Sequence, residues 1–84
     1  MKLLWTEAAW KEYCNWQNQD KKTLKKLNEI IKDMQRNPQT GIGKPEQLKG
    51  DLSGLWSRRI DGANRIVYRI KDEAIEILAC KNHY

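Results

Sequence analysis

The pattern of apolar and polar positions changes along the chain, and each change predicts a different element. Near the start, Lys2–Trp5 is a short apolar run typical of a strand. Three aromatic residues then recur at every third position: Trp10, Tyr13 and Trp16. This spacing predicts the buried stripe of a helix that begins after Thr6 as its N-cap and runs to about Gln17.

A second helix is predicted by apolar residues at intervals of three and four, with lysines on the outside: Leu24, Leu27, Ile31 and Met34. Asp20 is placed to cap its start. Asn37-Pro38 predicts its end, because proline disfavours the helical conformation in the residue before it. The stripe is too short for a coiled coil, so it indicates a helix that lies on a sheet.

The segment Gln39–Asp51 is rich in glycine and proline and is predicted to be a loop. Its "GIGK" sequence is not a phosphate-binding loop, because Pro45 stands where serine or threonine should follow the lysine. The apolar spacing then becomes two, in the runs 54–60, 64–70 and 73–80. This period predicts three antiparallel strands joined by short turns.

Together these elements predict an α+β fold in a single domain spanning residues 1–84. The order is strand–helix–helix–strand–strand–strand, with two helices packed on one face of a small, mostly antiparallel sheet. Alternation in the fifth element predicts which side chains face the helices, namely Ile66, Tyr68 and Ile70, and which face away, namely Arg65, Val67 and Arg69. The second face of the sheet is expected to be partly open and to place most of the charge on a single side.

The net charge favours a polyanionic partner. Sixteen Lys and Arg residues against eleven Asp and Glu give a formal charge of +5, which suits nucleic acid or an acidic protein. A soluble protein that merely happens to be basic would have the same total. The positions of the charges therefore have to decide between these interpretations.

The sequence also limits where the protein can act and which chemistry it can carry out. The first apolar run soon meets Glu7 and Lys11, so it is neither a signal peptide nor a membrane span. Cys14 and Cys80 lie far apart and, with the single histidine, make no recognisable metal-ligand set. We therefore expect a cytoplasmic protein with two free, packed thiols, no metal, no cofactor and no contact with a membrane.

Six basic residues crowd the predicted loop and the strands after it: Lys44, Lys49, Arg58, Arg59, Arg65 and Arg69. Charged residues on an antiparallel strand often only solvate its outer face. Several guanidiniums at alternate strand positions would nevertheless share one surface, where each planar fork can bind two phosphate oxygens. Trp56 beside them could stack on a base, although a core tryptophan is the simpler interpretation.

A carboxylate, an imidazole and arginines are sufficient to cleave RNA without a metal. The ribose 2′-hydroxyl is the nucleophile, so the protein supplies a base, an acid for the departing 5′-oxygen and positive charge on the phosphate. Glu46, His83 and the arginines form this set in minimal form. DNA would be inert, because it lacks the 2′-hydroxyl. Taken alone, each has an ordinary explanation, since most loop glutamates are solvated and chain ends seldom carry function.

The sequence "KPEQLKGDLSGLWSRRIDGANRIVYRI", followed by a terminal "HY", closely resembles YoeB toxins of the RelE/YoeB superfamily. The likeness runs from "MKLLWTEAAW" to Tyr84. It implies a microbial-ribonuclease-like fold and cleavage of mRNA in the A site of the translating ribosome. It also implies inhibition by a small, acidic, partly disordered antitoxin.

The resemblance implies a catalytic role for each of four residues. Glu46 matches the general base, Arg65 the stabiliser of the transition-state phosphate, and His83 the general acid. Tyr84 matches the terminal tyrosine that helps to orient the substrate. An imidazole, with an ordinary pKa of about 6.5, could serve as base or acid, so the choice of Glu46 as base comes from the resemblance.

RNA contact is expected from four further basic residues: Lys44, Lys49, Arg58 and Arg59. Two of them, Lys49 and Arg59, match residues that support activity or RNA contact in the family. The chain departs from its relatives at Lys81-Asn82, where a basic residue followed by an aromatic one is common. This departure concerns substrate stacking and leaves the proposed acid–base pair unchanged.

The position of His83 sets a geometric requirement. With perfect alternation in the last strand, His83 would share the core side with Ile75 and Ile77. For His83 to reach Arg65, the strand has to end or bulge near Cys80, and we predict that it does.

The resemblance implies a YefM-like antitoxin, the 70S ribosome and mRNA as partners, together with a homodimer. DNA is not expected as a partner alone, and operator DNA enters only through the antitoxin complex. Two other functions fit the same fold. One is a ParE-like toxin that poisons DNA gyrase without catalysis, and the other is a basic module that only binds RNA or protein.

Overall fold

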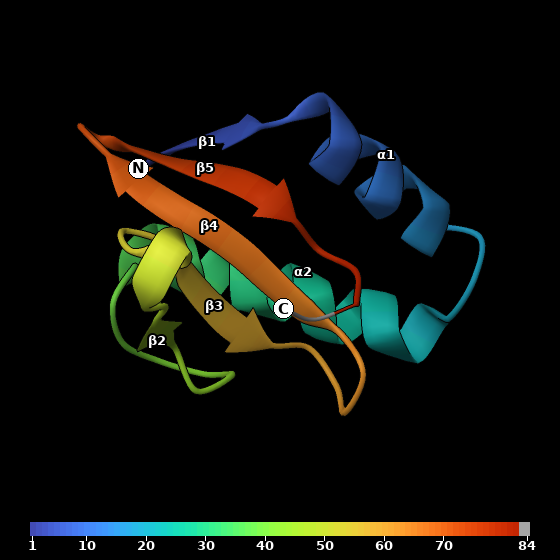
Figure 1. The fold of residues 1–84 in the computed structure, drawn as a ribbon. Coiled ribbons are helices and arrows are strands. Elements are labelled where there is room, and N and C mark those ends of the chain that lie inside the picture. The colour runs from blue at the N-terminus through green and yellow to red at the C-terminus, as the bar shows by residue number, and fades with distance from the viewer. Residues whose placement is uncertain (83–84) are drawn as a thin grey trace.

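Five strands form one sheet in the order β1-β5-β4-β3-β2, and two helices cover one of its faces (Figure 1). The computed structural model describes residues 1–82. The strands are β1 (Lys2–Trp5), β2 (Glu46–Gln47), β3 (Trp56–Arg59), β4 (Arg65–Lys71) and β5 (Ala74–Ala79). The helices are α1 (Glu7–Trp16), α2 (Lys21–Arg36) and the short 3-10 helix η1 (Gly50–Leu52). All neighbouring strands are antiparallel except β1, which runs parallel to β5. The predicted α+β fold is confirmed.

Both helices begin at the predicted N-caps. The Thr6 hydroxyl accepts a hydrogen bond from the backbone N–H of Ala9 at 3.1 Å. The Asp20 carboxylate accepts from the backbone N–H groups of Lys22 and Thr23. Each cap satisfies amide groups that have no partner within the helix, an effect that contributes about 1 kcal/mol per cap. α2 ends at Arg36, directly before Asn37-Pro38 as predicted.

The core lies between α2 and the centre of the sheet. Leu27, Ile30 and Met34 of α2 are inaccessible to solvent and belong to the same cluster as Ile66 and Tyr68 of β4. Burial of each such aliphatic side chain contributes about 1.5–3 kcal/mol. The predicted assignment of the two faces of β4 is therefore confirmed.

The predicted stripe of α1 is wrong at Trp10. Trp16 is buried in the core, but 51% of the surface of Trp10 is exposed. Six residues at about 100° each leave these two side chains roughly 120° apart around a helix, so both cannot face the sheet. The Trp10 ring instead packs edge-on against Trp5, with ring centroids 5.5 Å apart.

The predicted loop between α2 and β3 contains two short elements, β2 and η1. β2 pairs antiparallel with β3, so that Glu46 lies opposite Ser57 and Gln47 opposite Trp56. This pairing makes β2 an edge strand of the sheet and fixes the position of Glu46 beside β3.

The expectation that most of the charge lies on one side is wrong. Arg65 and Arg69 lie on the sheet face away from the helices, and each forms an ion pair there, with Glu46 and Glu76 respectively. Six further cations are exposed along α2, on the opposite side of the molecule: Lys21, Lys22, Lys25, Lys26, Lys32 and Arg36. The basic residues therefore form two surfaces. Within residues 1–82, no helix is both long and apolar enough to cross a membrane.

Candidate active site

Glu46 and Arg65 meet on the open face of the sheet. Nη1 of Arg65 lies 2.9 Å from Oε1 of Glu46 and also donates to the Ser57 hydroxyl at 3.3 Å. The contact bridges β2 and β4 across the end of β3. The Arg65 side chain is 22% exposed and that of Glu46 is 58% exposed. A carboxylate and a guanidinium 19 residues apart in sequence thus share one solvent-accessible site.

Three buried residues lie in a row across the sheet beside this pair. Ser57 of β3, Val67 of β4 and Ala79 of β5 are successive partners in the strand register. All three are buried, although they belong to the face away from the helices. Directly opposite side chains on one face of a sheet lie about 4.5–5.5 Å apart. These three buried residues therefore pack beside Arg65 and Glu46 and support them.

The last strand ends and shifts register where predicted. Val67 pairs with Ala79, but the next residue, Tyr68, pairs with Ile77, so Leu78 is an extra residue in β5. β5 then stops at Ala79. The irregularity brings Ala79 to the open face. The prediction of an end or bulge near Cys80 is therefore confirmed.

α1 holds the backbone of Cys80 from both sides. The Glu12 carboxylate accepts from the Cys80 N–H at 2.8 Å, and the Trp16 indole N–H donates to the Cys80 carbonyl at 2.8 Å. The Cys80 thiol is buried beside Ala9, whereas Cys14 is exposed, so the expectation of two packed thiols is wrong for Cys14. Burial, together with the negative charge of Glu12, raises the pKa of the Cys80 thiol to about 12, so the group stays protonated.

The chain is held again two residues later, at Asn82. Its carbonyl accepts from the backbone N–H of Arg65 at 2.7 Å, and its own N–H donates to the Asn64 side-chain carbonyl at 2.7 Å. Asn82 has a φ of 61°, in the left-handed region that asparagine tolerates better than most residues. The last described residue is thus bonded to the residue that carries the site's guanidinium. His83 and Tyr84 lie outside the described residues, and their roles stay predictions.

Three of the four predicted RNA-binding residues are exposed. Arg59 lies directly opposite Arg65 in the register of β3 and β4. Lys44 is exposed two residues before Glu46, and Lys49 is exposed directly before η1. Arg59 thus adds a second cation beside Arg65, while Lys44 and Lys49 flank the strand that carries Glu46.

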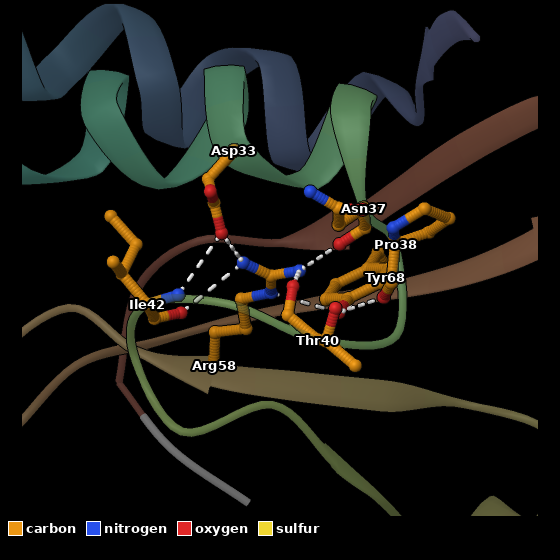
Figure 2. A network of polar contacts seen from close by, with 7 residues as sticks. All are labelled: Asp33, Asn37, Pro38, Thr40, Ile42, Arg58 and Tyr68. Carbon is orange, nitrogen blue, oxygen red and sulfur yellow. Dashed lines mark hydrogen bonds and ion pairs between the residues drawn. The ribbon is translucent and has the colours of Figure 1, made fainter.

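The fourth, Arg58, does not lie on this surface, and the expectation that it contacts RNA is corrected. Its side chain is inaccessible to solvent. Figure 2 shows that it points toward α2 and the segment that follows it. All five N–H donors of the guanidinium are used inside the protein. The acceptors are the Tyr68 hydroxyl, the Asp33 carboxylate and the carbonyls of Asn37, Thr40 and Ile42. Because β3 alternates its faces, Arg58 and Arg59 point to opposite sides.

The Arg58 network fixes the segment between α2 and β2 (Figure 2). Asp33 also accepts from the Ile42 N–H, and Tyr68 donates to the Pro38 carbonyl. The hydrogen bond from Arg58 holds the pKa of Asp33 below its ordinary value, while burial raises the pKa of Tyr68 despite its own bond to Arg58. The network therefore sets the path by which the chain reaches Glu46.

Several residues of the site were not predicted from the sequence: Glu12, Trp16, Asp33, Ser57, Asn64 and Tyr68. Alternation gave a usable signal for Arg58, because Trp56 and Ile60 are apolar at the positions two before and two after it. The part of the chain described here holds no group of three His, Cys, Asp or Glu side chains able to bind a metal ion. The expectation of metal-free chemistry stays a prediction.

Comparison with known proteins decides the family. The model of the YoeB-like toxin of bacterial type II toxin–antitoxin systems matches residues 5–84. The chain belongs to this family. Toxin YoeB of Escherichia coli O6:H1 is 54% identical to it over 84 residues, and the match covers 100% of each chain.

Solved structures of YoeB toxins have the same fold. A YoeB/ParE toxin from Agrobacterium tumefaciens superposes with a TM-score of 0.95 at 44% identity, over 100% of both chains. A YoeB dimer from Staphylococcus aureus gives a TM-score of 0.90 at 44% identity, over 100% of this chain and 98% of that one. The toxin in a heterotetrameric YoeB–YefM complex from the same organism gives 0.89 at 44% identity, with the same coverage. Residues that form the Arg58 network and the Glu46–Arg65 pair therefore belong to a YoeB-like scaffold.

Proposed function

We propose that this YoeB-like toxin is an endoribonuclease that cleaves mRNA in the ribosomal A site by metal-free acid–base catalysis and so arrests translation. The observation that carries the proposal is the 2.9 Å contact between Glu46 and Arg65 on an exposed sheet face. It puts an accessible carboxylate beside a cation, as phosphodiester cleavage by a ribose hydroxyl requires. The toxin acts in the cytoplasm, where mRNA is translated.

The reaction assigns one step to each group. Glu46 takes the proton of the ribose 2′-hydroxyl, whose oxygen then bonds to the adjacent phosphorus. The Arg65 guanidinium stabilises the negative charge on the phosphate oxygens, using donors beyond those that contact Glu46 and Ser57. The bond from phosphorus to the 5′-oxygen breaks, and His83 donates a proton to that oxygen. Tyr84 orients the substrate.

The anchoring of the preceding chain supports the role of His83. Cys80 is held by two residues of α1, and Asn82 is hydrogen-bonded to Asn64 and to the backbone of Arg65. His83 follows Asn82 directly in the sequence. Placement of reacting groups supplies much of the rate in such reactions, because it removes the entropy cost of bringing them together. Cleavage of free RNA is therefore expected to be weak without the ribosome.

The partners follow from the family and the charge. We assign this chain a YefM-like acidic antitoxin and a toxin homodimer, by analogy with the S. aureus complex and dimer. The exposed cations Lys44, Lys49 and Arg59 contact the message backbone. An acidic, partly disordered antitoxin would be ordered as it binds this basic protein.

A reconstituted translation reaction tests the proposal. Ribosomes programmed with a defined mRNA are mixed with wild type, Glu46→Gln, Arg65→Met or His83→Gln, and cleavage is mapped by primer extension. Wild type should cut in the A-site codon, and each variant should lose at least about a hundredfold in rate. A message with a single 2′-deoxy nucleotide at the cleavage position should resist the wild type. Full cleavage of that message would refute the 2′-hydroxyl mechanism.

The second candidate function is that of a ParE-like toxin, because the similar A. tumefaciens structure is described as a YoeB/ParE toxin. A ParE-like activity would inhibit DNA gyrase by contact and would leave mRNA intact. Supercoiling assays with the same variants separate the two functions. Gyrase inhibition that survives in His83→Gln, without cleavage of message, would favour the ParE-like activity.

A further inference from the structure

The outward surface of α2 is almost entirely cationic. Of its seven exposed residues, six are basic: Lys21, Lys22, Lys25, Lys26, Lys32 and Arg36. The seventh is Glu29. At about 100° per residue these positions fall within one stripe roughly 140° wide, along a helix about 24 Å long. We call the six basic residues the α2 lysine surface.

This surface is unfavourable for the helix that carries it. The first turn of α2 contains no acidic residue, although the positive end of the helix dipole favours one there. Lys21 and Lys25, and Lys22 and Lys26, are like-charge pairs at a spacing of four, which destabilises a helix. Two carboxylates offset part of this repulsion, that of the N-cap Asp20 and that of Glu29, which lies four residues after Lys25 and three before Lys32. Charges kept against local preference indicate a role outside the folding of the helix.

The described part of the chain does little to neutralise these cations. Its three ion pairs involve Arg58, Arg65 and Arg69, all of which lie on the sheet. No carboxylate among residues 1–82 lies within ion-pair distance of the α2 lysine surface. The surface therefore presents its charge to solvent, where a polyanion can bind it.

The composition of the surface favours RNA over protein as this polyanion. Protein interfaces are depleted in lysine and have an apolar or aromatic centre. The stripe has no exposed apolar residue, and Leu24 at its border is half-buried. Lysine is a flexible point charge that suits phosphates without reading sequence. The spacing of the cations along about 20 Å fits a sugar–phosphate backbone rather than one ion.

The location of the surface distinguishes this RNA from the cleaved strand. The buried stripe of α2 faces the sheet, so the α2 lysine surface points away from it. Glu46 and Arg65 lie on the other face of the same sheet. Figure 1 shows α2 lying across one side of the sheet. A message strand in the site would not reach α2 without passing around a molecule at least 25 Å across.

We propose that the α2 lysine surface binds the phosphate backbone of folded RNA that surrounds the toxin when message occupies the sheet face. The inference rests on the proposed function, in which that folded RNA is ribosomal. It assigns the two basic surfaces different tasks. The sheet face binds and cleaves the message, while α2 docks the toxin on the particle that presents it.

The test compares two variants with the same loss of charge. Lys21, Lys22 and Lys25 are changed to Gln in one, and the exposed residues Lys2, Lys11 and Lys71 in the other. Both carry His83→Gln so that message is not consumed, and binding to programmed 70S ribosomes is measured from 50 to 200 mM salt. The α2 variant should bind about tenfold more weakly than the control, with a salt slope smaller by about two. Its Tm should equal or exceed that of the control, because repulsion in α2 has been relieved.

Each outcome bears on a separate statement. Equal ribosome affinity and equal salt slopes for the two variants would refute the role of α2 and leave the proposed function standing. Loss of antitoxin affinity with ribosome binding unchanged would show that the surface binds acidic protein instead of RNA. If the parent His83→Gln toxin does not bind ribosomes at all, the proposed function falls, and this inference falls with it.

Discussion

The guanidinium of Arg58 and the carboxylate of Asp33 form an ion pair inside the protein, with Nη1 2.7 Å from Oδ2. The pair joins β3 to the last turns of α2. A buried cation is tolerated here because every N–H of the guanidinium has an acceptor. Arg58 thus influences the site through the backbone leading to Glu46, and not by contact with RNA.

Replacement of Arg58 should therefore affect stability first. In Arg58→Met three backbone carbonyls lose their guanidinium donor and the Asp33 carboxylate loses its cation, so the free energy of unfolding should fall by about 3–5 kcal/mol. Urea denaturation measures it. Arg59→Met is the matched control, since Arg59 is exposed and its loss should change stability by less than about 0.5 kcal/mol. A stable Arg58→Met protein with weakened RNA binding would restore the original prediction for this residue.

The same ion pair predicts a loss of stability in acid. The hydrogen bond from Arg58, assisted by the Ile42 N–H, holds the pKa of Asp33 below its ordinary value of 3.8. A lowered folded-state pKa contributes stability above pH 3.8, which is lost as the pH falls through the folded-state value. Asp33→Asn should be less stable than wild type at pH 7. The difference in Tm should shrink as the pH falls from 4 to 2, whereas a constant difference would contradict the linkage.

Periodicity predicted the elements that are long enough to show it. The caps Thr6 and Asp20 and the alternation of β4 were readable because they depend on near neighbours in sequence. β2 was missed because two residues cannot display a period. The charge of Arg58 predicts an exposed side chain, but its alternation with the apolar residues Trp56 and Ile60 places it on the buried face, where the structure has it.

Only part of the candidate site could be predicted from the sequence. Glu46 and Arg65 were chosen by a resemblance, and their contact depends on the pairing of β2 with β3. The bonds of Glu12 and Trp16 to Cys80 join residues more than 60 positions apart. No local pattern encodes such pairs, since they follow from how α1 packs beside the end of β5.

Gly41 is predicted to be irreplaceable for a steric reason. Its φ is +125°, and a Cβ there would lie 1.8 Å from Oδ2 of Asp33, inside the Arg58 network. Gly41→Ala should lower the free energy of unfolding by at least about 2 kcal/mol, through backbone strain and displacement of that carboxylate. Gly62→Ala is the control, because a Cβ there meets nothing within 4 Å. Equal stability of the two variants in urea would show that the loop adjusts freely.

Glu12 is predicted to act on catalysis by positioning the chain before His83. Its carboxylate accepts from the buried Cys80 N–H at 2.8 Å, and Glu12→Ala would leave that donor unpaired. An unpaired buried donor costs about 1–3 kcal/mol, enough to free the segment and lower kcat by about tenfold or more, while KM for ribosomes changes little. Rates are measured well below the Tm of each variant, so a purely structural role would leave kcat unchanged.

The conservative variant separates positioning from charge. Glu12→Gln keeps an acceptor oxygen for Cys80 and should recover most of the lost rate. Lys11→Ala, at the exposed neighbouring position of α1, should behave as wild type. A wild-type kcat in Glu12→Ala would show that the hydrogen bond between Glu12 and Cys80, at the end of β5, does not affect the reaction. Equal damage in Glu12→Gln would assign the effect to the negative charge of Glu12, because the hydrogen bond to Cys80 is preserved in that variant.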